Sequence, residues 1–100
     1  MSVNVLCSSM NFEWDEAKSL RNAIDRRLPF DIAIAMFDGP TLEEPDTRRD
    51  YGEVRIKAIG TVRGLCLVCV YTDRSEVRRI ISLRLANRKE RDDYRAAYQG

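Results

Sequence analysis

The sequence predicts an α+β domain: a small antiparallel sheet covered by two N-terminal helices and followed by a C-terminal helix. Three observations carry this prediction. Apolar residues recur at helical spacing between residues 17 and 37, alternating and β-branched residues dominate residues 53–85, and a helix-start signal stands at Asn87. Helices that precede a run of strands, instead of alternating with them, are typical of the α+β class.

Length and composition predict one domain over residues 1–100, because 44% hydrophobic and 33% charged residues are ordinary for a globular protein of this size. Residues 1–9 lack the basic and apolar segments of a secretion signal, so we interpret residues 1–10 as a flexible tail. No apolar run approaches the roughly 20 residues of a membrane span. We therefore expect a cytoplasmic protein without membrane contact.

Two short helices are predicted in the first 40 residues, after a stretch at Asn11–Trp14 that is compatible with an edge strand. Asp15 suits an N-cap, Pro29 ends the first helix, and Asp38-Gly39-Pro40 ends the second. The apolar stripe of the first helix consists of Ala17, Leu20, Ile24 and Leu28. The stripe of the second consists of Phe30, Ala33, Ile34 and Phe37. We expect both stripes to cover the sheet.

Three strands with short connections predict an antiparallel meander: Glu53–Val62, Leu65–Thr72 and Val77–Leu85. Leu65–Thr72 is apolar on both faces and is the expected central strand, while Thr41–Arg49 is a loop or an irregular edge strand. The alternation slips at Ala58-Ile59-Gly60, which predicts a bulge or a bend. In the last strand, alternation places Arg78, Ile80, Ser82 and Arg84 on one face and Arg79, Ile81, Leu83 and Leu85 on the other.

The last helix begins at Asn87, and Glu90 stands at its third position, which is a capping-box arrangement with Asn in place of Ser or Thr. Tyr94, Ala97 and Tyr98 give this helix a thin apolar side. Glu90 is therefore open to two interpretations, as a helix cap or as a catalytic carboxylate. Tyr94 is likewise either a packing residue or a catalytic one.

The chain has three cysteines, Cys7, Cys66 and Cys69, and this odd number argues against a closed disulfide framework. Cys66 and Cys69 form a C-x-x-C pair inside a predicted strand, where residues three apart point to opposite faces. The chain has no histidine and no second cysteine pair to complete a metal site. We expect free, largely buried thiols and no metal or other cofactor.

The charge distribution favours an anionic ligand. Residues 1–47 carry four basic and nine acidic side chains, whereas residues 48–100 carry thirteen basic and seven acidic ones. The absence of histidine excludes Ser-His and Cys-His nucleophile pairs. Arg, Lys, Glu, Asp and Tyr can still catalyse the attack of a ribose 2′-hydroxyl on its neighbouring phosphate without a metal, because guanidinium groups stabilise the charge that gathers on phosphorus.

Alternation places Glu53, Arg55 and Lys57 on one face of their strand, and Arg78, Ser82 and Arg84 on one face of another strand. The hypothesis is that the two faces coincide. Together these faces would form a basic surface for a phosphodiester. The alternative is that they are only the solvent side of a half-covered sheet, with salt bridges among their charges. Sequence alone does not fix the register that would bring them together.

Five stretches together resemble the BrnT-type toxins of bacterial type II toxin–antitoxin pairs, over roughly residues 12–94. The stretches are Phe12-Glu13-Trp14-Asp15-Glu16-Ala17-Lys18 with Asn22, Phe37-Asp38-Gly39-Pro40, Asp46-x-Arg48 with Tyr51-Gly52-Glu53-x-Arg55 and Ile59-Gly60, Leu67-Val68-x-Val70-Tyr71-Thr72, and Arg79-Ile80-Ile81-Ser82-x-Arg84-x-Ala86 continued by Arg88-x-Glu90-Arg91 and Tyr94. The resemblance implies a RelE-like fold, a ribonuclease that arrests translation, and a cognate BrnA-type antitoxin that also links the pair to operator DNA. This chain has Asp25-Arg26-Arg27-Leu28-Pro29 where the family commonly shows K-H-G, so Arg26 or Arg27 would have to replace any contribution of that histidine.

We therefore predict a metal-independent endoribonuclease toxin. The expected catalytic residues are Arg79, Arg84, Glu90 and Tyr94, and the expected RNA-binding residues are Arg55, Lys57, Arg78 and Arg88. The prediction requires Arg79, Arg84 and Arg88 to converge on one patch. The competing hypothesis is a non-catalytic binding module whose basic face docks an acidic partner helix. A DNA-binding protein is a third class, but no helix-turn-helix with a basic recognition helix is evident.

Overall fold

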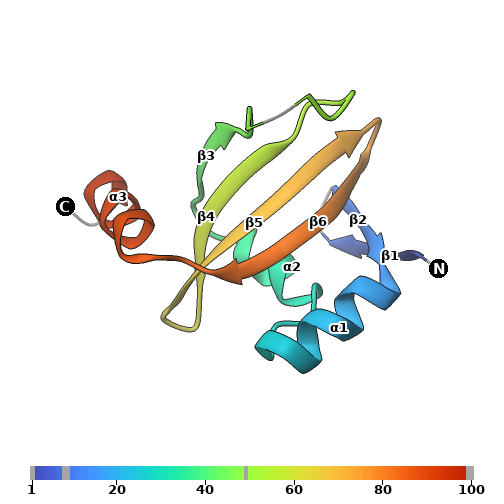
Figure 1. Cartoon of the computed structure of the whole chain (residues 1–100), viewed down its shortest axis with the longest axis horizontal. Helices are drawn as coiled ribbons and strands as arrows, with labels where there is room; N and C mark the ends of the chain where they lie inside the picture. Colours follow the sequence, from blue (N-terminus) through green and yellow to red (C-terminus); the bar gives the residue numbers. More distant parts are fainter. Residues whose placement is uncertain (1, 8–9, 49, 99–100) are drawn as a thin grey trace.

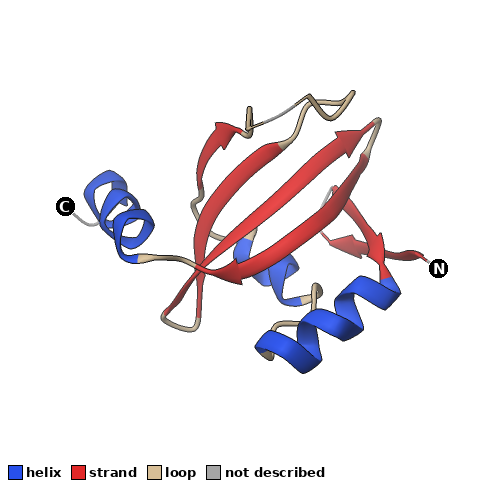
Figure 2. Cartoon of the chain, viewed as in Figure 1, coloured by secondary structure: helices blue, strands red, loops and turns tan. Residues whose placement is uncertain are grey.

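The computed structural model describes residues 2–7, 10–48 and 50–98, with side chains from residue 11 onward. Within these residues the chain forms one six-stranded mixed sheet and three helices (Figures 1 and 2). The strands are β1 (Ser2–Cys7), β2 (Met10–Asp15), β3 (Leu42–Pro45), β4 (Ile56–Val62), β5 (Leu65–Arg74) and β6 (Val77–Leu85). The helices are α1 (Glu16–Arg26), α2 (Ile32–Met36) and α3 (Arg88–Tyr98). The predicted α+β class is confirmed, but the sheet is larger than predicted.

The strand order is β1-β2-β6-β5-β4-β3. Strands β4, β5 and β6 form the predicted antiparallel meander. Strand β3 pairs antiparallel with β4 at the edge of the sheet, so the edge-strand interpretation of residues 41–49 is confirmed for Leu42–Pro45. Strand β2 instead runs parallel to β6. The sheet is therefore mixed, and its two central strands, β6 and β5, carry most of the buried positions.

The N-terminal segment departs from the prediction. Ser2–Cys7 is not a tail, because it forms β1 and pairs antiparallel with β2 from Ser2↔Asp15 to Cys7↔Met10. As a result the stretch Asn11–Trp14 lies inside the sheet and not at its edge. The β-branched residues Val3 and Val5 favour an extended strand. A segment this short forms a strand only by pairing with β2, and the sequence pattern does not contain that pairing.

A bulge in β6 changes which side chains share a face. Val70 of β5 pairs with Ser82 and the next residue, Tyr71, pairs with Ile80, so Ile81 is an extra residue in β6. Arg78 therefore lies on the opposite face from Ser82 and Arg84, and the prediction that these three share a face is wrong. No such shift occurs in β4, which pairs with β5 without interruption from Ile56 to Val62.

The predicted slip at Ala58-Ile59-Gly60 has a different cause. All three residues are buried, because α2 packs on one face of β4 and α3 on the other. A Cβ atom on Gly60 would lie 2.6 Å from Met36 Cγ of α2, so only glycine permits this close approach. Alternation fails here because both faces of the strand are covered.

The main core fills the space between the sheet and the two N-terminal helices. It consists of Phe12, Trp14, Leu28, Phe30, Ala33, Met36, Ala58, Leu67, Cys69, Tyr71, Ile80 and Leu83. We call this side of the sheet the covered face. In Figure 1, α2 lies behind the meander and α1 runs along its lower border. Of the stripe predicted for the second helix, Phe30 and Ala33 are buried and Ile34 and Phe37 are half-buried, while Met36, which the stripe did not include, is buried as well.

Helix α1 does not bury the stripe that the sequence predicts. Asp15 caps it as expected, accepting hydrogen bonds from the backbone N–H groups of Ala17 and Lys18. However, Leu20 is 57% exposed and Ile24 is 80% exposed. The pairing of β6 with β2 ends at Ile80, so the carbonyl groups that follow on this edge of β6 have no strand partner. Helix α1 packs beside this part of β6. Helix α1 supplies polar partners there.

Hydrogen bonds tie α1 to β6 and to the segment that follows the helix. Asn22 donates its amide hydrogens to the carbonyl oxygens of Leu83 (2.9 Å) and Leu28 (2.6 Å), and Ser19 Oγ accepts from the backbone N–H of Phe30 at 2.9 Å. An apolar stripe is not needed for a helix that is held this way. These contacts also place Arg26, at the end of α1, at the border of the face of the sheet that the two N-terminal helices do not cover.

The second face of the sheet, which we call the open face, is covered only at one end. Helix α3 packs there through a small cluster that contains Ile59, Val68, Ala86 and Tyr94. The predicted capping box of α3 is confirmed in both directions: Asn87 Oδ1 accepts from the backbone N–H of Glu90, and Glu90 Oε1 accepts from that of Asn87, both at 2.8 Å. The rest of the open face carries charged side chains.

The two described cysteines lie as predicted. Cys69 belongs to the main core and Cys66 packs against the cluster beneath α3, so the two thiols are on opposite faces and both are free. Burial raises the pKa of the Cys69 thiol well above its ordinary value, which makes it unreactive. The side chain of Cys7 lies outside the described residues. Among the described residues, no helix has the length and apolar character that crossing a membrane would require.

Candidate active site

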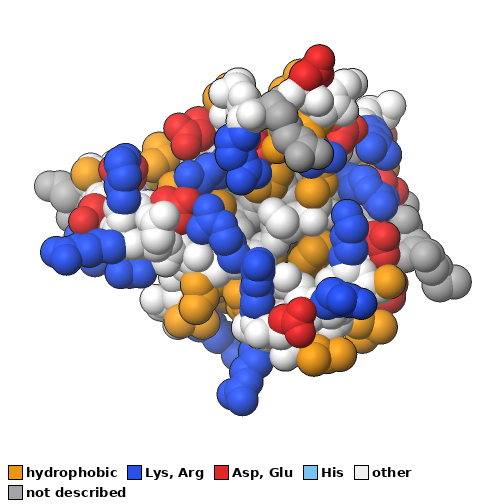
Figure 3. Space-filling view, viewed as in Figure 1, with side chains coloured by type: hydrophobic (Ala, Val, Ile, Leu, Met, Phe, Trp, Pro, Cys, Tyr) orange, Lys and Arg blue, Asp and Glu red, His pale blue; other side chains and the backbone are white. Residues whose placement is uncertain are grey.

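A groove of about 550 Å³ runs along the open face. It is lined by side chains from α1, from β3 and the loop after it, and from the three meander strands: Arg26, Glu44, Pro45, Asp46, Thr47, Arg48, Lys57, Val70, Ser82 and Arg84. Figure 3 shows Lys and Arg side chains spread over this face, with Asp and Glu among them. Four of the lining residues are cations and two are carboxylates, which is a composition suited to an anionic ligand.

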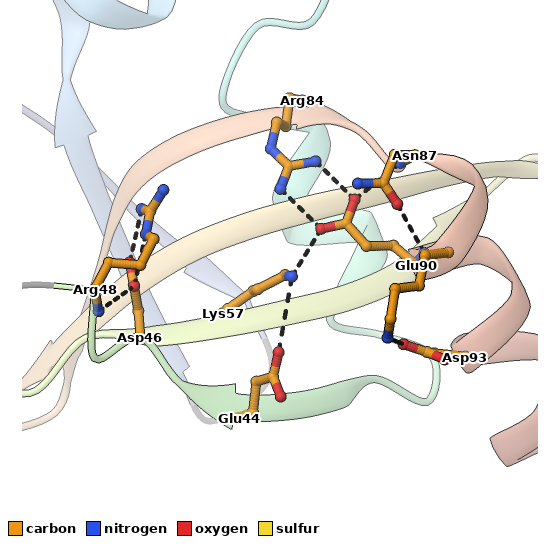
Figure 4. A network of polar contacts seen from close by, with 9 residues as sticks. Glu44, Asp46, Arg48, Lys57, Arg84, Asn87, Glu90 and Asp93 are labelled. Atoms are coloured by element: carbon orange, nitrogen blue, oxygen red, sulfur yellow. Dashed lines mark hydrogen bonds and ion pairs between the residues drawn. The ribbon is translucent and has the colours of Figure 1, made fainter.

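Arg84 and Lys57 meet at the buried carboxylate of Glu90, at one end of the groove (Figure 4). Arg84 donates from Nη1 and Nη2 to the two oxygens of Glu90, each at 2.8 Å. Lys57 Nζ lies 2.7 Å from Glu90 Oε2. The side chain of Glu90 is only 6% exposed, whereas Arg84 and Lys57 are half-buried and border the groove. The carboxylate thus lies beneath the two cations and fixes both.

The sheet register explains why these residues meet. Lys57 pairs with Val70 and Val70 with Ser82, so Lys57, Ser82 and Arg84 project from the same face of three adjacent strands. Glu90 reaches them because the capping box holds its side chain back toward the start of α3. The hydrogen bonds from Arg84, with those from Lys57 and the Asn87 backbone, hold the pKa of Glu90 well below its usual range.

The other end of the groove is built around Asp46, in the loop after β3. Arg48 donates from Nε and Nη2 to the two oxygens of Asp46 at 2.8 and 2.9 Å, and the backbone N–H of Asp46 donates to Arg55 O at 2.8 Å. This bidentate pair lowers the pKa of Asp46, mainly through the hydrogen bonds from Arg48. It also holds an exposed guanidinium group at the mouth of the groove.

Three groove residues were absent from the predicted site: Arg48, Glu44 and Asp46. Asp46 and Arg48 had one signal in the sequence, the Asp46-x-Arg48 spacing, which allows a local bidentate pair but does not indicate the face of the sheet that the pair joins. Glu44 had no such signal. Arg26, considered from the sequence as a replacement for the family's histidine, does line the groove and donates to Leu83 O at 3.4 Å. Arg27 instead occupies the left-handed C-cap of α1.

Two predicted cations remain on the open face or at its end but outside the groove. Arg79 pairs with Glu13 of β2 at 3.1 Å. Arg88 is 89% exposed and its Nε lies 4.0 Å from Asp92 within α3. Since Arg79, Arg84 and Arg88 pair with three different carboxylates, the predicted convergence of these guanidinium groups is wrong.

The remaining predicted residues have other surroundings. Arg78 lies on the covered face, where its guanidinium is over the rings of Tyr71 (3.9 Å) and Phe37 (4.8 Å), and it pairs with Asp73 at 2.9 Å. Arg55 precedes β4 and stacks on Tyr51 at 3.9 Å.

Tyr94 is buried, and its hydroxyl donates to Pro40 O at 2.8 Å. The packing interpretation accounts for this tyrosine.

Comparison with known proteins identifies the family. Residues 14–90 match the family model described as "Ribonuclease toxin, BrnT, of type II toxin-antitoxin system". The chain belongs to the BrnT family. The matched span contains Lys57, Arg84 and Glu90, and thus the cluster at the end of the groove. A search of curated proteins gives no match. BrnT proteins are ribonuclease toxins, which implies an RNA target and an antitoxin partner.

Proposed function

We propose that this BrnT protein is a metal-independent endoribonuclease that acts in the cytoplasm, cleaves RNA by attack of a ribose 2′-hydroxyl and thereby arrests translation. The observation that supports the groove as the site is the cluster in which Glu90 fixes both Arg84 and Lys57 at its end. Two cations held rigidly beside each other suit the developing charge of a phosphodiester in the transition state. Their orientation is set before RNA binds.

In the proposed reaction, the 2′-hydroxyl gives its proton to a base at the groove, its oxygen attacks the adjacent phosphorus, and the P–O5′ bond breaks. Arg84 and Lys57 stabilise the negative charge on the non-bridging oxygens. The leaving O5′ takes a proton from water at the open side of the groove, so the products are a 2′,3′-cyclic phosphate and a 5′-hydroxyl. Arg48 and Arg26, at the other borders of the groove, would hold flanking phosphates.

The surroundings of Glu90 favour a positioning role over a catalytic one. Its oxygens accept hydrogen bonds from Arg84, Lys57 and the Asn87 backbone, and its lowered pKa makes it a poor proton acceptor near neutral pH. Arg79, Arg88 and Tyr94 do not line the groove, so the proposal gives them no part in bond cleavage. The catalytic assignment therefore narrows to Arg84 and Lys57.

The test compares two lysines. Purified protein is incubated with RNA, with and without ribosomes, and the new ends are mapped. We expect 5′-hydroxyl ends, cleavage that persists in a metal chelator, and a rate about 100-fold lower in Lys57→Ala. Lys18→Ala, which removes an exposed lysine on α1 that does not line the groove, is the matched control and should cleave normally. Absence of cleavage by the wild type under all conditions would refute the proposal.

A second candidate function is a non-catalytic module that docks its antitoxin through the open face. It is favoured by one observation: Arg84 and Lys57 already have an internal carboxylate partner, so they are neutralised without RNA. For either function the proposed partner is a BrnA-type antitoxin, which would also provide the link to operator DNA. Tight antitoxin binding by a protein that never cleaves RNA would select this second candidate.

A further inference from the structure

We propose that Glu44, on the edge strand β3, is the general base that removes the proton from the attacking 2′-hydroxyl. The inference rests on the proposed ribonuclease function and adds a catalytic residue to it. No sequence pattern singles out Glu44, which stands in a polar stretch beside another glutamate. Its selection depends on the surroundings of the three carboxylates at the groove.

Two of these carboxylates are fully engaged. The oxygens of Glu90 accept four contacts, from Arg84, Lys57 and the Asn87 backbone. The oxygens of Asp46 accept a bidentate pair from Arg48, and Tyr51 OH lies 3.5 Å from Asp46 Oδ2. A carboxylate held in this way has no free lone pair directed at a substrate. Its lowered pKa also makes it a poor acceptor for a proton.

Glu44 differs from both in its contacts and its exposure. Among the described residues its carboxylate makes one ion pair, with Lys57 Nζ at 3.7 Å, which is longer than a hydrogen bond. Its side chain is 66% exposed, and it lines the groove. It is thus the carboxylate of the described groove that RNA can reach without breaking an existing bidentate or buried contact.

The register places Glu44 beside the proposed phosphate site. Glu44 pairs with Lys57 across β3 and β4, so both side chains project from the open face. Figure 4 shows Lys57 between the two glutamates, with Glu90 on the side of Arg84 and Glu44 on the side of β3. A phosphate held by Arg84 and Lys57 would therefore have its attached ribose next to Glu44.

The proton transfer completes the cleavage step. The O2′–H proton moves to a carboxylate oxygen of Glu44 as the O2′–P bond forms, the P–O5′ bond breaks, and O5′ takes a proton from water. Glu44 then loses its proton to solvent, which its exposure allows. General bases of this kind contribute about 10²- to 10⁴-fold to a rate.

The test is the single-turnover cleavage rate of Glu44→Gln as a function of pH, beside Glu44→Asp. Binding of the same RNA with a 2′-deoxy residue at the cleavage site is measured in parallel. We expect Glu44→Gln to lower the rate about 100-fold and to abolish its fall at acid pH, with binding changed less than about threefold. Glu44→Asp should restore part of the rate. The matched control is Glu76→Gln, an exposed glutamate in the turn between β5 and β6.

Each outcome decides between the two proposals. Wild-type cleavage with an unaltered rate and pH profile in Glu44→Gln overturns the role of Glu44 and leaves the ribonuclease function intact. Equal losses of binding and cleavage also overturn it, because Glu44 would then act in RNA binding. If the wild type cleaves no RNA with or without ribosomes, the proposed function fails and the role of Glu44 fails with it.

Discussion

The two faces of the central strands use the same residue type for opposite purposes. Arg78 and Arg84 lie six residues apart in β6, but the bulge at Ile81 sends them to different faces. On the covered face, Arg78 is enclosed by Tyr71 and Phe37 and contributes to packing. On the open face, Arg84 is held by a carboxylate at the border of a groove. Surroundings, more than residue type, separate a structural arginine from a candidate catalytic one.

The difference also shows how stability and activity are divided in this small domain. The covered face holds the main core and tolerates little change, whereas the open face holds oriented charges that a ligand can reach. Substitutions on the two faces should therefore have separable effects on unfolding and on cleavage.

The largest effect on stability should come from Leu83→Ala, on the covered face of β6. Leu83 is completely buried, so its truncation leaves a cavity and should lower the free energy of unfolding by about 3 kcal/mol. Leu85→Ala, two residues further along but exposed, is the matched control and should change it by less than about 0.5 kcal/mol. Urea denaturation measures both. Both side chains project from the covered face, so equal effects of the two substitutions would contradict the burial of Leu83 in the main core.

A smaller loss is expected for Glu90→Gln on the open face. Glutamine preserves the capping box with Asn87 but removes the charge that holds Arg84 and Lys57, at a cost of about 2 kcal/mol. Because the pKa of Glu90 is lowered in the folded protein, its contribution is complete above the unfolded value of about 4.3 and is lost as the pH falls through the folded pKa. The stability difference between wild type and variant should thus be constant from about pH 7 to 5 and shrink below about pH 4.

Measuring urea denaturation of both proteins from pH 7 down to pH 3 tests this dependence. A difference that grows on acidification would mean that the carboxylate is not stabilised by its cations. Asp93→Asn, on the exposed side of α3, provides a control for the loss of one negative charge.

Arg78→Ala should cost less, about 1 kcal/mol, through its lost stacking on Tyr71 and its lost ion pair with Asp73. Thermal unfolding of this variant and of Arg74→Ala, an exposed arginine at the end of β5, gives the comparison. A stability loss no larger than that of Arg74→Ala would remove the packing role assigned to Arg78.

The smallest effect is expected on the outer side of α1. Leu20→Lys and Ile24→Lys place charges at positions that are already exposed, so each should change the free energy of unfolding by less than about 0.5 kcal/mol. Denaturation of the isolated protein measures this. A loss of several kcal/mol would show that the stripe predicted from the sequence is buried after all.

Local sequence patterns correctly predict the last strand and the start of the last helix, because the signals for both lie within a few residues. Val77–Leu85 has the predicted bounds, and Asn87 and Glu90 form the predicted capping box in both directions. The stripe of α1 misled because its spacing is truly helical, while the burial of a helix depends on where it packs. Asn22 and Ser19, two polar residues, hold α1 in place.

The candidate site was predicted only in part, for a related reason. Arg84 and Lys57 are predicted from charge and strand alternation, Glu90 from its capping-box position and the family resemblance, and the three side chains do meet. Arg78 was misplaced because a bulge shifts every later side chain to the other face, and no glycine or proline in β6 marks this bulge. Glu44 reaches the groove because β3 pairs with β4, and Arg48 reaches it because its loop follows β3. Local sequence patterns do not contain this pairing.

The most direct test measures RNA cleavage by Arg84→Ala and Arg78→Ala beside the wild type, at a temperature where all three are folded. If the groove on the open face is the active site, Arg84→Ala should lose about 100-fold in rate, and Arg78→Ala should stay within about threefold of the wild type. Equal rates for all three proteins, or a loss as large in Arg78→Ala as in Arg84→Ala, would contradict this assignment.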